Sequence, residues 1–198
     1  MNDQDRVVIR TASVEDRVEA IQAALDAKGL KASEAVEELG HKAQEEWLPR
    51  NGARIVARAW IDPGFRKRLL ANGREAAMEM GFPMPKHHRH LVVLENTPKV
   101  QNVICCTLCS CTAFTLIGLP PDWYKDLQYR SRVVRESRTV LKEMGLELAS
   151  EVEVRVWDTT ADTRYMVLPE RPGHTQGWTE EQLAAIVTRD SLIGVARL

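Results

Sequence analysis

Apolar positions follow a helical spacing through the first part of the chain. The first helix is expected between Ser13, which can cap it with Asp16 at the capping-box position, and Gly29, which can end it. A second helix is expected to begin near Ser33 and to extend to Trp47. Three more helical stretches follow, at residues 49–62, from Asp62–Pro63 onward, and up to Gly81.

From residue 91 onward the helical spacing of apolar positions is lost, and short apolar or alternating runs predict strands. The predicted strands are residues 91–96, 100–106, 151–158 and 163–169. A turn at residues 96–98 joins the first two, and the third alternates strictly between apolar and polar positions. Further helices are predicted at residues 122–145 and 180–190. The fold class is therefore α+β: a helical N-terminal segment, then a globular domain with a small β-sheet flanked by helices.

The two N-terminal helices have narrow apolar stripes and charged flanks. They can form a helical hairpin that packs on its own domain, or an arm that packs partly on another subunit. The spacing leaves both interpretations open. We predict two regions: residues 1–50 as a helical N-terminal arm and residues 51–198 as a globular domain.

Composition narrows the classes of partner. The chain has 198 residues, and its 27 Lys and Arg nearly balance its 28 Asp and Glu, so nothing indicates binding to nucleic acid or a membrane surface. No apolar run approaches the length of a membrane span, and the N-terminus lacks the apolar core of a signal peptide. We therefore expect a cytoplasmic protein, in which clustered cysteines bind metal or react more often than they form disulfides.

All four cysteines of the chain lie between residues 105 and 111, in the sequence CCTLCSC. A metal that takes both sulfurs of Cys109 and Cys111 and the backbone nitrogens of Ser110 and Cys111 closes one six-membered and two five-membered chelate rings. These rings have little strain and favour a planar set of two nitrogens and two sulfurs. Cys106 can loop back as an axial ligand, which leaves one position open.

This donor set suits a trivalent transition metal such as cobalt or iron better than zinc, which prefers four tetrahedral side-chain ligands. Spacing alone leaves other interpretations open: a zinc site, a redox pair of Cys106 and Cys109, or unrelated buried thiols.

The motif CTLCSC, followed by GLPPDWYK, YRSRVVRE, RVWDTTADTRYMVLPERP and VTRDSLIGV, resembles the α subunit of nitrile hydratase. The resemblance extends from about GARIVARAWIDPGFRKRLL to the C-terminus and is looser in the N-terminal helices. It implies a layered α-β-β-α domain and the hydration of a nitrile to an amide, at a non-corrin Co(III) or non-haem Fe(III) centre.

The resemblance also implies a ligand set. Cys106 is the axial thiolate, Cys109 a sulfinic acid and Cys111 a sulfenic acid, while Ser110 and Cys111 provide amide nitrogens. Thr107, after the first ligand cysteine, points to cobalt, because the family's iron members usually carry Ser there.

Catalytic roles follow from the same resemblance. Cys111 and Ser110 belong to the reacting centre, and Arg164 matches an arginine position of the family beside the metal; Asp158 and Tyr165 are weaker candidates. The implied partner is a β subunit, in an αβ or α2β2 assembly, which covers the motif and favours the arm interpretation of the first helices. An activator protein that loads cobalt is also implied.

The chain departs from the family at three places. Cys105 stands where an aliphatic residue is usual, and we interpret it as a buried strand residue. Phe114 and Thr115 replace a Trp-Pro pair at the pocket wall, so the accepted nitrile can differ. His87 and His88 fall where the family often has a Gln-Gly pair near the pocket.

The segment KHHRH, which also contains His90, raises the question of a second metal site. Its histidines do not share one face, so we favour a loop without metal, or a role for His87 near the pocket. Two alternatives remain for the whole chain: a thiocyanate hydrolase-like metal subunit, and a metal-binding or redox protein without catalysis.

Overall fold

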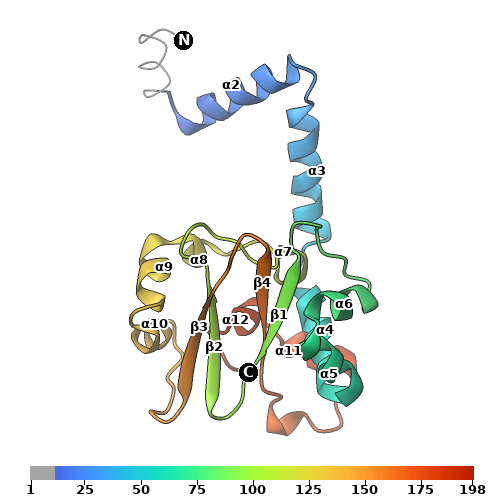
Figure 1. Cartoon of the computed structure of the whole chain (residues 1–198), viewed down its shortest axis with the longest axis vertical. Coiled ribbons are helices and arrows are strands. Elements are labelled where there is room, and N and C mark those ends of the chain that lie inside the picture. Colours follow the sequence, from blue (N-terminus) through green and yellow to red (C-terminus); the bar gives the residue numbers. More distant parts are fainter. Residues whose placement is uncertain (1–11) are drawn as a thin grey trace. The chain divides into compact units, whose positions relative to one another are not determined.

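The computed structural model describes residues 12–198, and the first part of the predicted arm, residues 1–11, lies outside the described residues. The described chain forms two compact units, one ending at Glu45 and the other running from Glu46 to Leu198. The division falls a few residues before the predicted one at residue 50. Figure 1 shows both units.

The N-terminal unit contains two helices, α2 (Val14–Asp26) and α3 (Ala32–Glu45). The predicted capping box is present, since the Ser13 hydroxyl accepts a bond from the backbone N–H of Asp16 and the Asp16 carboxylate accepts one from Ser13. In the described structure no residue of either helix is buried. Large apolar side chains that are exposed in this unit are Val14, Val18, Ile21, Leu30, Val36 and Leu39.

The predicted end of the second helix, at Trp47, is wrong. The second helix ends at Glu45, so Trp47 lies beyond it, in the unit that follows. Its ring packs on that of Phe114, with centroids 4.5 Å apart. The helical spacing at Trp47 is therefore a coincidence, because a contact distant in the sequence determines where the indole lies.

Three helices open the globular unit: α4 (Pro49–Ile61), α5 (Pro63–Ala71) and α6 (Gly73–Glu79). Proline occupies the first turn of α4 and of α5, where its missing N–H costs nothing. The Asp62 carboxylate caps α5 by accepting a bond from Phe65 N. Gly81, with φ of 81°, follows α6 as predicted.

The four predicted strands all form: β1 (His90–Glu95), β2 (Val100–Cys105), β3 (Glu153–Asp158) and β4 (Thr163–Leu168). Although a short turn joins β1 and β2, they do not pair with each other. Instead β1 pairs with β4 and β2 pairs with β3, both in parallel. The Asn96 side chain at the turn accepts a bond from Asn102 N and so holds the ends of the two strands together.

The directions of the strands determine which strand ends lie together at one edge of the two sheets. The loop of residues 159–162 reverses the chain between β3 and β4, so the two parallel pairs run in opposite directions, with β2 in contact with β4 (Figure 1). The carboxyl ends of β2 and β3, where Cys105 pairs with Asp158, therefore lie at the same edge as the starts of β1 and β4, where His90 pairs with Thr163. Loops distant in the sequence meet there.

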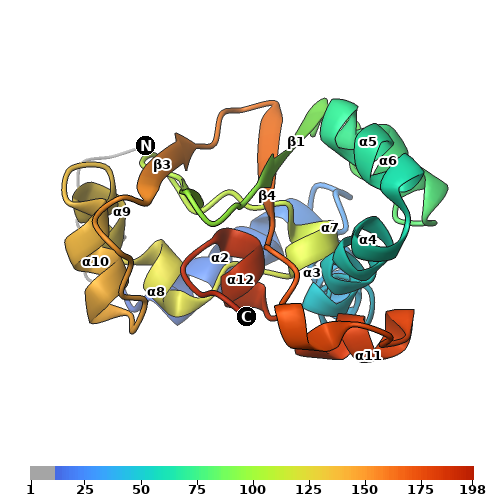
Figure 2. The same ribbon diagram turned by 90° about the horizontal axis from the view of Figure 1, so that it is seen from below.

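Short helices cover the strands. They are α7 (Phe114–Ile117), α8 (Asp122–Lys125), α9 (Leu127–Val133), α10 (Ser137–Glu143), the 3-10 turn η1 (Gly173–Thr175), α11 (Glu180–Ile186) and α12 (Arg189–Ile193). Two long helices of the sequence analysis are thus divided: extended residues at Asp126 and Val187 interrupt them, and Thr188 with Ser191 forms a new capping box. Figure 2 shows α9 and α10 beyond β3, and α5 and α6 beyond β1.

The core depends on one close approach. Helix α12 packs on β2 and β4, and Gly194 ends it with φ of 93°. A Cβ at this position would stand 1.9 Å from the carbonyl oxygen of Asn102 in β2. Only glycine fits both the conformation and the space. No helix in the described residues is both long and apolar enough to cross a membrane.

Candidate metal centre

The cysteine loop lies where the strand ends meet. Cys105 ends β2, residues 106–111 form the loop, and α7 begins at Phe114. The Sγ atoms of Cys106 and Cys109 are 3.3 Å apart, and those of Cys109 and Cys111 are 2.7 Å apart. Within residues 12–198, these three cysteines form the group of side chains whose donor atoms lie within 4.8 Å of one another, close enough to hold one metal ion.

The donor set fits a transition metal. Two sulfurs on adjacent corners of one ion, each about 2.3 Å from it, stand about 3.3 Å apart. The separation of the Cys106 and Cys109 sulfurs matches this value, whereas the Cys109 and Cys111 sulfurs, 2.7 Å apart, stand closer than it. The backbone N–H of Cys111 also faces the Cys106 sulfur, so a backbone nitrogen lies beside the sulfur cluster. The structure thus brings together the three predicted sulfur ligands.

The four thiols differ in their electrostatic surroundings. Burial raises the pKa of Cys106, but hydrogen bonds from the Thr159 hydroxyl and from the N–H groups of Cys109 and Cys111 outweigh it and lower the pKa to about 7. Burial, together with the neighbouring Cys109 sulfur, raises the pKa of Cys111 to about 12. Cys106 is therefore better prepared than Cys111 to bind a metal as a thiolate.

Cys105 is separate from this group. It is fully buried in the core, and burial, with smaller effects of the Asp158 charge and of Cys106, raises its pKa to about 12. It is a buried strand residue, as the sequence analysis predicts, and it stays a neutral thiol.

Strand β3 holds the start of the loop. The Asp158 carboxylate accepts hydrogen bonds from Thr107 N (2.9 Å) and Thr107 Oγ1 (2.5 Å). The next residue, Thr159, donates its N–H to Cys105 O at 3.0 Å, and its hydroxyl oxygen lies 3.4 Å from Cys111 O. The structure therefore gives Asp158, a weak candidate in the sequence, a contact with the loop. Tyr165, the other weak candidate, packs on Trp157.

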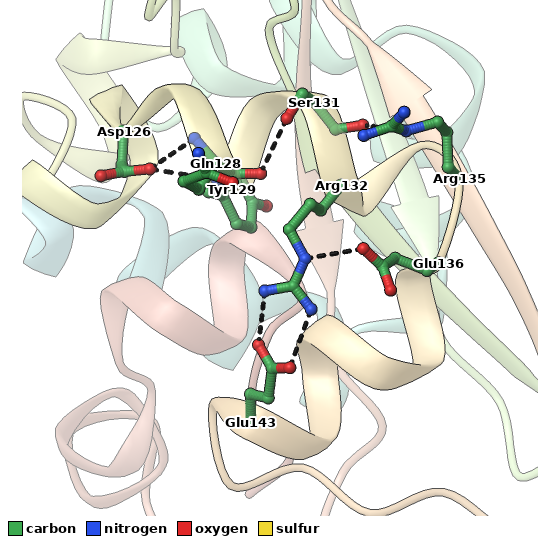
Figure 3. A network of polar contacts seen from close by, with 8 residues as sticks. All are labelled: Asp126, Gln128, Tyr129, Ser131, Arg132, Arg135, Glu136 and Glu143. Atoms are coloured by element: carbon green, nitrogen blue, oxygen red, sulfur yellow. Dashed lines mark hydrogen bonds and ion pairs between the residues drawn. The ribbon is translucent and has the colours of Figure 1, made fainter.

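Helices α8 and α9 hold the end of the loop through polar contacts that the sequence analysis does not identify. Tyr124 Oη donates to Cys111 O at 3.2 Å, Tyr129 Oη donates to Ile104 O at 2.8 Å, and Arg130 Nη1 donates to Cys109 O at 2.7 Å. Figure 3 shows how α9 is fixed to α10, through paired bonds from Arg132 to Glu143 and a further bond to Glu136. The segment DWYKDLQYR carries no local signal for these contacts, apart from its density of tyrosines.

Arg164 lies at the start of β4 and is 5% exposed. Its Nη1 donates to the carbonyl oxygens of Thr160 and Thr163, while its buried Nε has no hydrogen-bond partner among the described residues. Its charge helps to lower the pKa of His88 and opposes the rise in the pKa of Cys111, so the guanidinium acts on both side chains.

His88 is the buried member of the histidine segment, with 1% exposure and an unpartnered Nδ1 within the described structure. Its ring packs edge-on against Phe114, at 5.0 Å between centroids, and against His87 at 4.4 Å. Burial, aided by the Arg164 charge, lowers the pKa of His88 to about 4, so it is neutral at pH 7. His90 lies exposed at the start of β1.

Arg74 of α6 fixes the segment that carries these histidines. Its guanidinium donates to the carbonyl oxygens of Met84 and Pro85, both at 3.1 Å, and to that of His88. His88, not His87, is therefore the histidine placed beside Phe114 and Arg164.

Comparison with known proteins extends these observations. The sequence model of the family described as "Nitrile hydratase, alpha chain" matches residues 12–196. The low-molecular weight cobalt-containing nitrile hydratase subunit alpha of Rhodococcus rhodochrous is 49% identical over 91% of this chain and 86% of its own. The thiocyanate hydrolase subunit gamma of Thiobacillus thioparus is 43% identical over 85% of this chain and 73% of its own.

Among solved structures, a double mutant of the Fe-type nitrile hydratase from Comamonas testosteroni Ni1 superposes with a TM-score of 0.90. It is 55% identical, and the match covers 93% of this chain and 89% of that one. The similarity confirms the resemblance drawn from CTLCSC and the α+β fold class. The chain is thus similar both to an Fe-type enzyme and to a subunit named cobalt-containing.

Proposed function

Because the chain belongs to the nitrile hydratase α-chain family, we propose that it is the metal-carrying subunit of an enzyme that hydrates nitriles to amides. The observation that carries the proposal is the convergence of three sulfurs, of Cys106, Cys109 and Cys111, at one edge of the sheets. An isolated redox pair would need two of these thiols and would leave the third without a role.

The proposed ligands are the three sulfurs and the backbone nitrogens of Ser110 and Cys111, with Cys109 as sulfinic and Cys111 as sulfenic acid. When bound, a trivalent ion supplies Lewis acidity that polarises a nitrile or activates a water. Cys111, whose thiol feels the charge of Arg164, would carry an oxygen that accepts or transfers a proton. Sulfenic and sulfinic acids are steps of the ordinary thiol oxidation ladder.

The neighbouring side chains have roles in holding the centre and shaping its surroundings. Arg164 provides a fixed positive charge beside Cys111, because its guanidinium is tied to carbonyl groups of the loop before β4. Neutral His88 and the ring of Phe114 form an apolar wall, packed against Trp47. We propose that this wall borders the substrate and that the chain's selection among nitriles lies there.

Cobalt is the metal we propose. Thr107 follows the first ligand cysteine, and the similar R. rhodochrous subunit is named cobalt-containing. Iron is the second candidate, favoured by the 55% identity to the Fe-type enzyme of C. testosteroni. Elemental analysis of the purified complex decides between them: one cobalt for each chain is expected, and one iron would overturn the choice of metal but not the centre.

The proposed partner is a nitrile hydratase β subunit. Leu108, at the tip of the cysteine loop, is 89% exposed, so a partner that covers the loop would bury this side chain. The exposed apolar residues of α2 and α3 support the proposal that residues 1–50 form an arm that packs on this partner. Expression without the partner should then give a chain that binds less metal or aggregates. We also propose a cytoplasmic location and an activator protein that loads the cobalt.

Thiocyanate hydrolysis is the second candidate function, favoured by the 43% identity to the thiocyanate hydrolase subunit. The two activities give different products: an amide from a nitrile, and carbonyl sulfide with ammonia from thiocyanate. The test is to supply the assembled complex with acrylonitrile, benzonitrile or thiocyanate. Amide formation supports the proposal, and hydrolysis of thiocyanate alone would overturn it.

Mass spectrometry of the loop peptide tests the proposed sulfur chemistry. Oxygen adducts of about 32 Da on Cys109 and about 16 Da on Cys111 are expected for sulfinic and sulfenic acids. Stoichiometric zinc with unmodified thiols would contradict both the centre and the proposed activity.

A further inference from the structure

Arg130 contacts the backbone of the cysteine loop from a different element. It lies in α9, and its Nη1 donates a hydrogen bond of 2.7 Å to the carbonyl oxygen of Cys109. Its Nε is buried and has no hydrogen-bond partner within residues 12–198. A buried donor without a partner is costly, so the guanidinium is placed here at the expense of stability.

The peptide that accepts this bond has a particular position in the loop. The carbonyl of Cys109 and the nitrogen of Ser110 belong to one amide group, and that nitrogen is a proposed metal ligand. Resonance in an amide couples its nitrogen to its oxygen. Negative charge that the nitrogen gains as a ligand is therefore shared by the Cys109 oxygen, where a guanidinium can offset it.

The charge of the whole donor set needs such a cation. The thiolate of Cys106, the sulfinate of Cys109 and an ionised sulfenate of Cys111 carry one negative charge each and together balance a trivalent ion. Each amide nitrogen that binds without its proton therefore adds uncompensated negative charge. Arg164 lies near Cys111 on one side, and Arg130 contacts the loop at Cys109. The two guanidinium groups come from β4 and α9, so they reach the centre from different elements.

Helix α9 holds Arg130 in place. Its neighbour Tyr129 donates to Ile104 O near the end of β2, and Arg132 joins α9 to Glu136 and Glu143 (Figure 3). The guanidinium therefore meets the loop from a supported helix.

We propose that Arg130 is a positioning residue of the metal centre: its guanidinium fixes and polarises the Cys109–Ser110 peptide so that the Ser110 nitrogen serves as a ligand. This inference rests on the proposed function, and it goes beyond it by assigning a role to a residue outside the cysteine motif. A purely mechanical role for Arg130, as a strap between α9 and the loop, is the competing interpretation.

The experiment compares variants of the full chain, assembled with the β subunit and produced with cobalt as the supplied metal. The variants are R130M, R130K, R132M and R135M. Two quantities are measured: the metal content of each chain after treatment with a chelator, and the energy of the sulfur-to-metal absorption band. Neither is a measure of activity, and a purely mechanical role is tested by R132M, which loosens α9 but leaves the Arg130 guanidinium in place.

Arg135 is the matched control, because it lies just after α9 and its Nε donates only locally, to Ser131 O at 3.0 Å (Figure 3). R132M is the structural control, because it removes the link between α9 and α10 without touching the loop. Both are expected to keep the metal and the band, although R132M unfolds at a lower temperature.

R130M is expected to retain about 10- to 100-fold less metal, the usual cost of losing a group that supports a ligand. The band of the remaining metal should be shifted, and R130K, which keeps the charge, should lie between R130M and the natural protein. If R130M does not fold, R130Q replaces it with the same expected loss.

Metal content and band energy of R130M equal to those of R135M would overturn the inference, and so would equal losses in R130M and R132M. In either case a metal-loaded natural complex leaves the proposed function intact. If the natural complex itself holds no transition metal, the proposed function fails and the role of Arg130 with it.

Discussion

Thr107 donates both its backbone N–H and its hydroxyl to the carboxylate of Asp158, at 2.9 and 2.5 Å. The pair ties the first turn of the cysteine loop to the end of β3, next to the position where Cys105 pairs with Asp158. The residue that suggests cobalt in the sequence is therefore also a structural anchor of the loop.

Replacement of Thr107 distinguishes its role as an anchor of the loop from a role in selecting the metal. Thr107→Val should lower the free energy of unfolding by about 1 kcal/mol, because it removes one hydrogen bond to an exposed carboxylate. Thr107→Ser keeps a hydroxyl and should leave both the stability and the bound metal unchanged. Chemical denaturation and elemental analysis of the complex measure the two effects. A change of metal in the Ser variant would show that residue 107 selects the ion.

The two adjacent cysteines 105 and 106 should respond differently to replacement. Cys106→Ala and Cys111→Ala remove proposed ligands and should abolish metal retention and activity together. Cys105→Ala removes only a buried sulfur, so we expect a loss of stability of about 1 kcal/mol with the metal retained. Elemental analysis and an amide assay make the comparison. An active, metal-loaded Cys111→Ala protein would show that the ligand assignment is wrong.

His88 should remain neutral over the physiological range of pH. Burial and the Arg164 charge lower its pKa to about 4 in the folded chain, whereas an unfolded histidine has a pKa of about 6.5. Between these two values the unfolded state binds the additional proton, so this residue makes stability rise with pH across that window and has no further effect above it. The slope of unfolding free energy against pH should be smaller in His88→Gln. An imidazole resonance of His88 that titrates near the unfolded value would contradict the expectation.

Replacing Gly194 or Gly145 by alanine should distinguish the cost of backbone strain from the cost of steric overlap. Both have φ near 90°, but a Cβ at Gly194 would overlap Asn102 O, whereas nothing lies within 4 Å of one at Gly145. Gly145→Ala should therefore cost about 1–2 kcal/mol from conformation alone. Gly194→Ala should cost about 1–3 kcal/mol more, from the forced separation of α12 and β2. Thermal unfolding of both variants tests this, and equal effects would mean that α12 moves freely.

Local sequence signals predict most elements but not their neighbours. Two helix starts could be predicted from capping boxes, because such a box is contained within four residues: Ser13 with Asp16, and Thr179 with Gln182. The pairing of β1 with β4 could not be predicted, since it joins segments about seventy residues apart in the sequence and the short turn at Thr97 suggests β2 instead. The helical spacing misplaces Trp47 for the same reason: its partner, Phe114, is distant in the chain.

In the candidate site, too, local features could be predicted from the sequence, whereas contacts between distant segments could not. The spacing of Cys106, Cys109 and Cys111 predicts that their sulfurs can converge, because chelate geometry depends on local covalent structure, and the three sulfurs do lie within 4.8 Å of one another. Arg130 and Tyr124 could not be predicted, because an arginine or a tyrosine on a short helix has no pattern that distinguishes a loop contact from an exposed position. The sequence marks the histidine segment as a place of interest, but only the fold shows that His88, and not His87, is buried.

The opposite directions of the two strand pairs leave the other edge of the sheets without a part in the site. The turn at Thr97–Pro98 lies at that edge, at the strand ends remote from Cys106. Exposed loop tips are among the places where a fold tolerates added residues. An affinity tag or a fluorescent label inserted there would report on assembly and metal loading while the cysteine loop keeps its native chemistry.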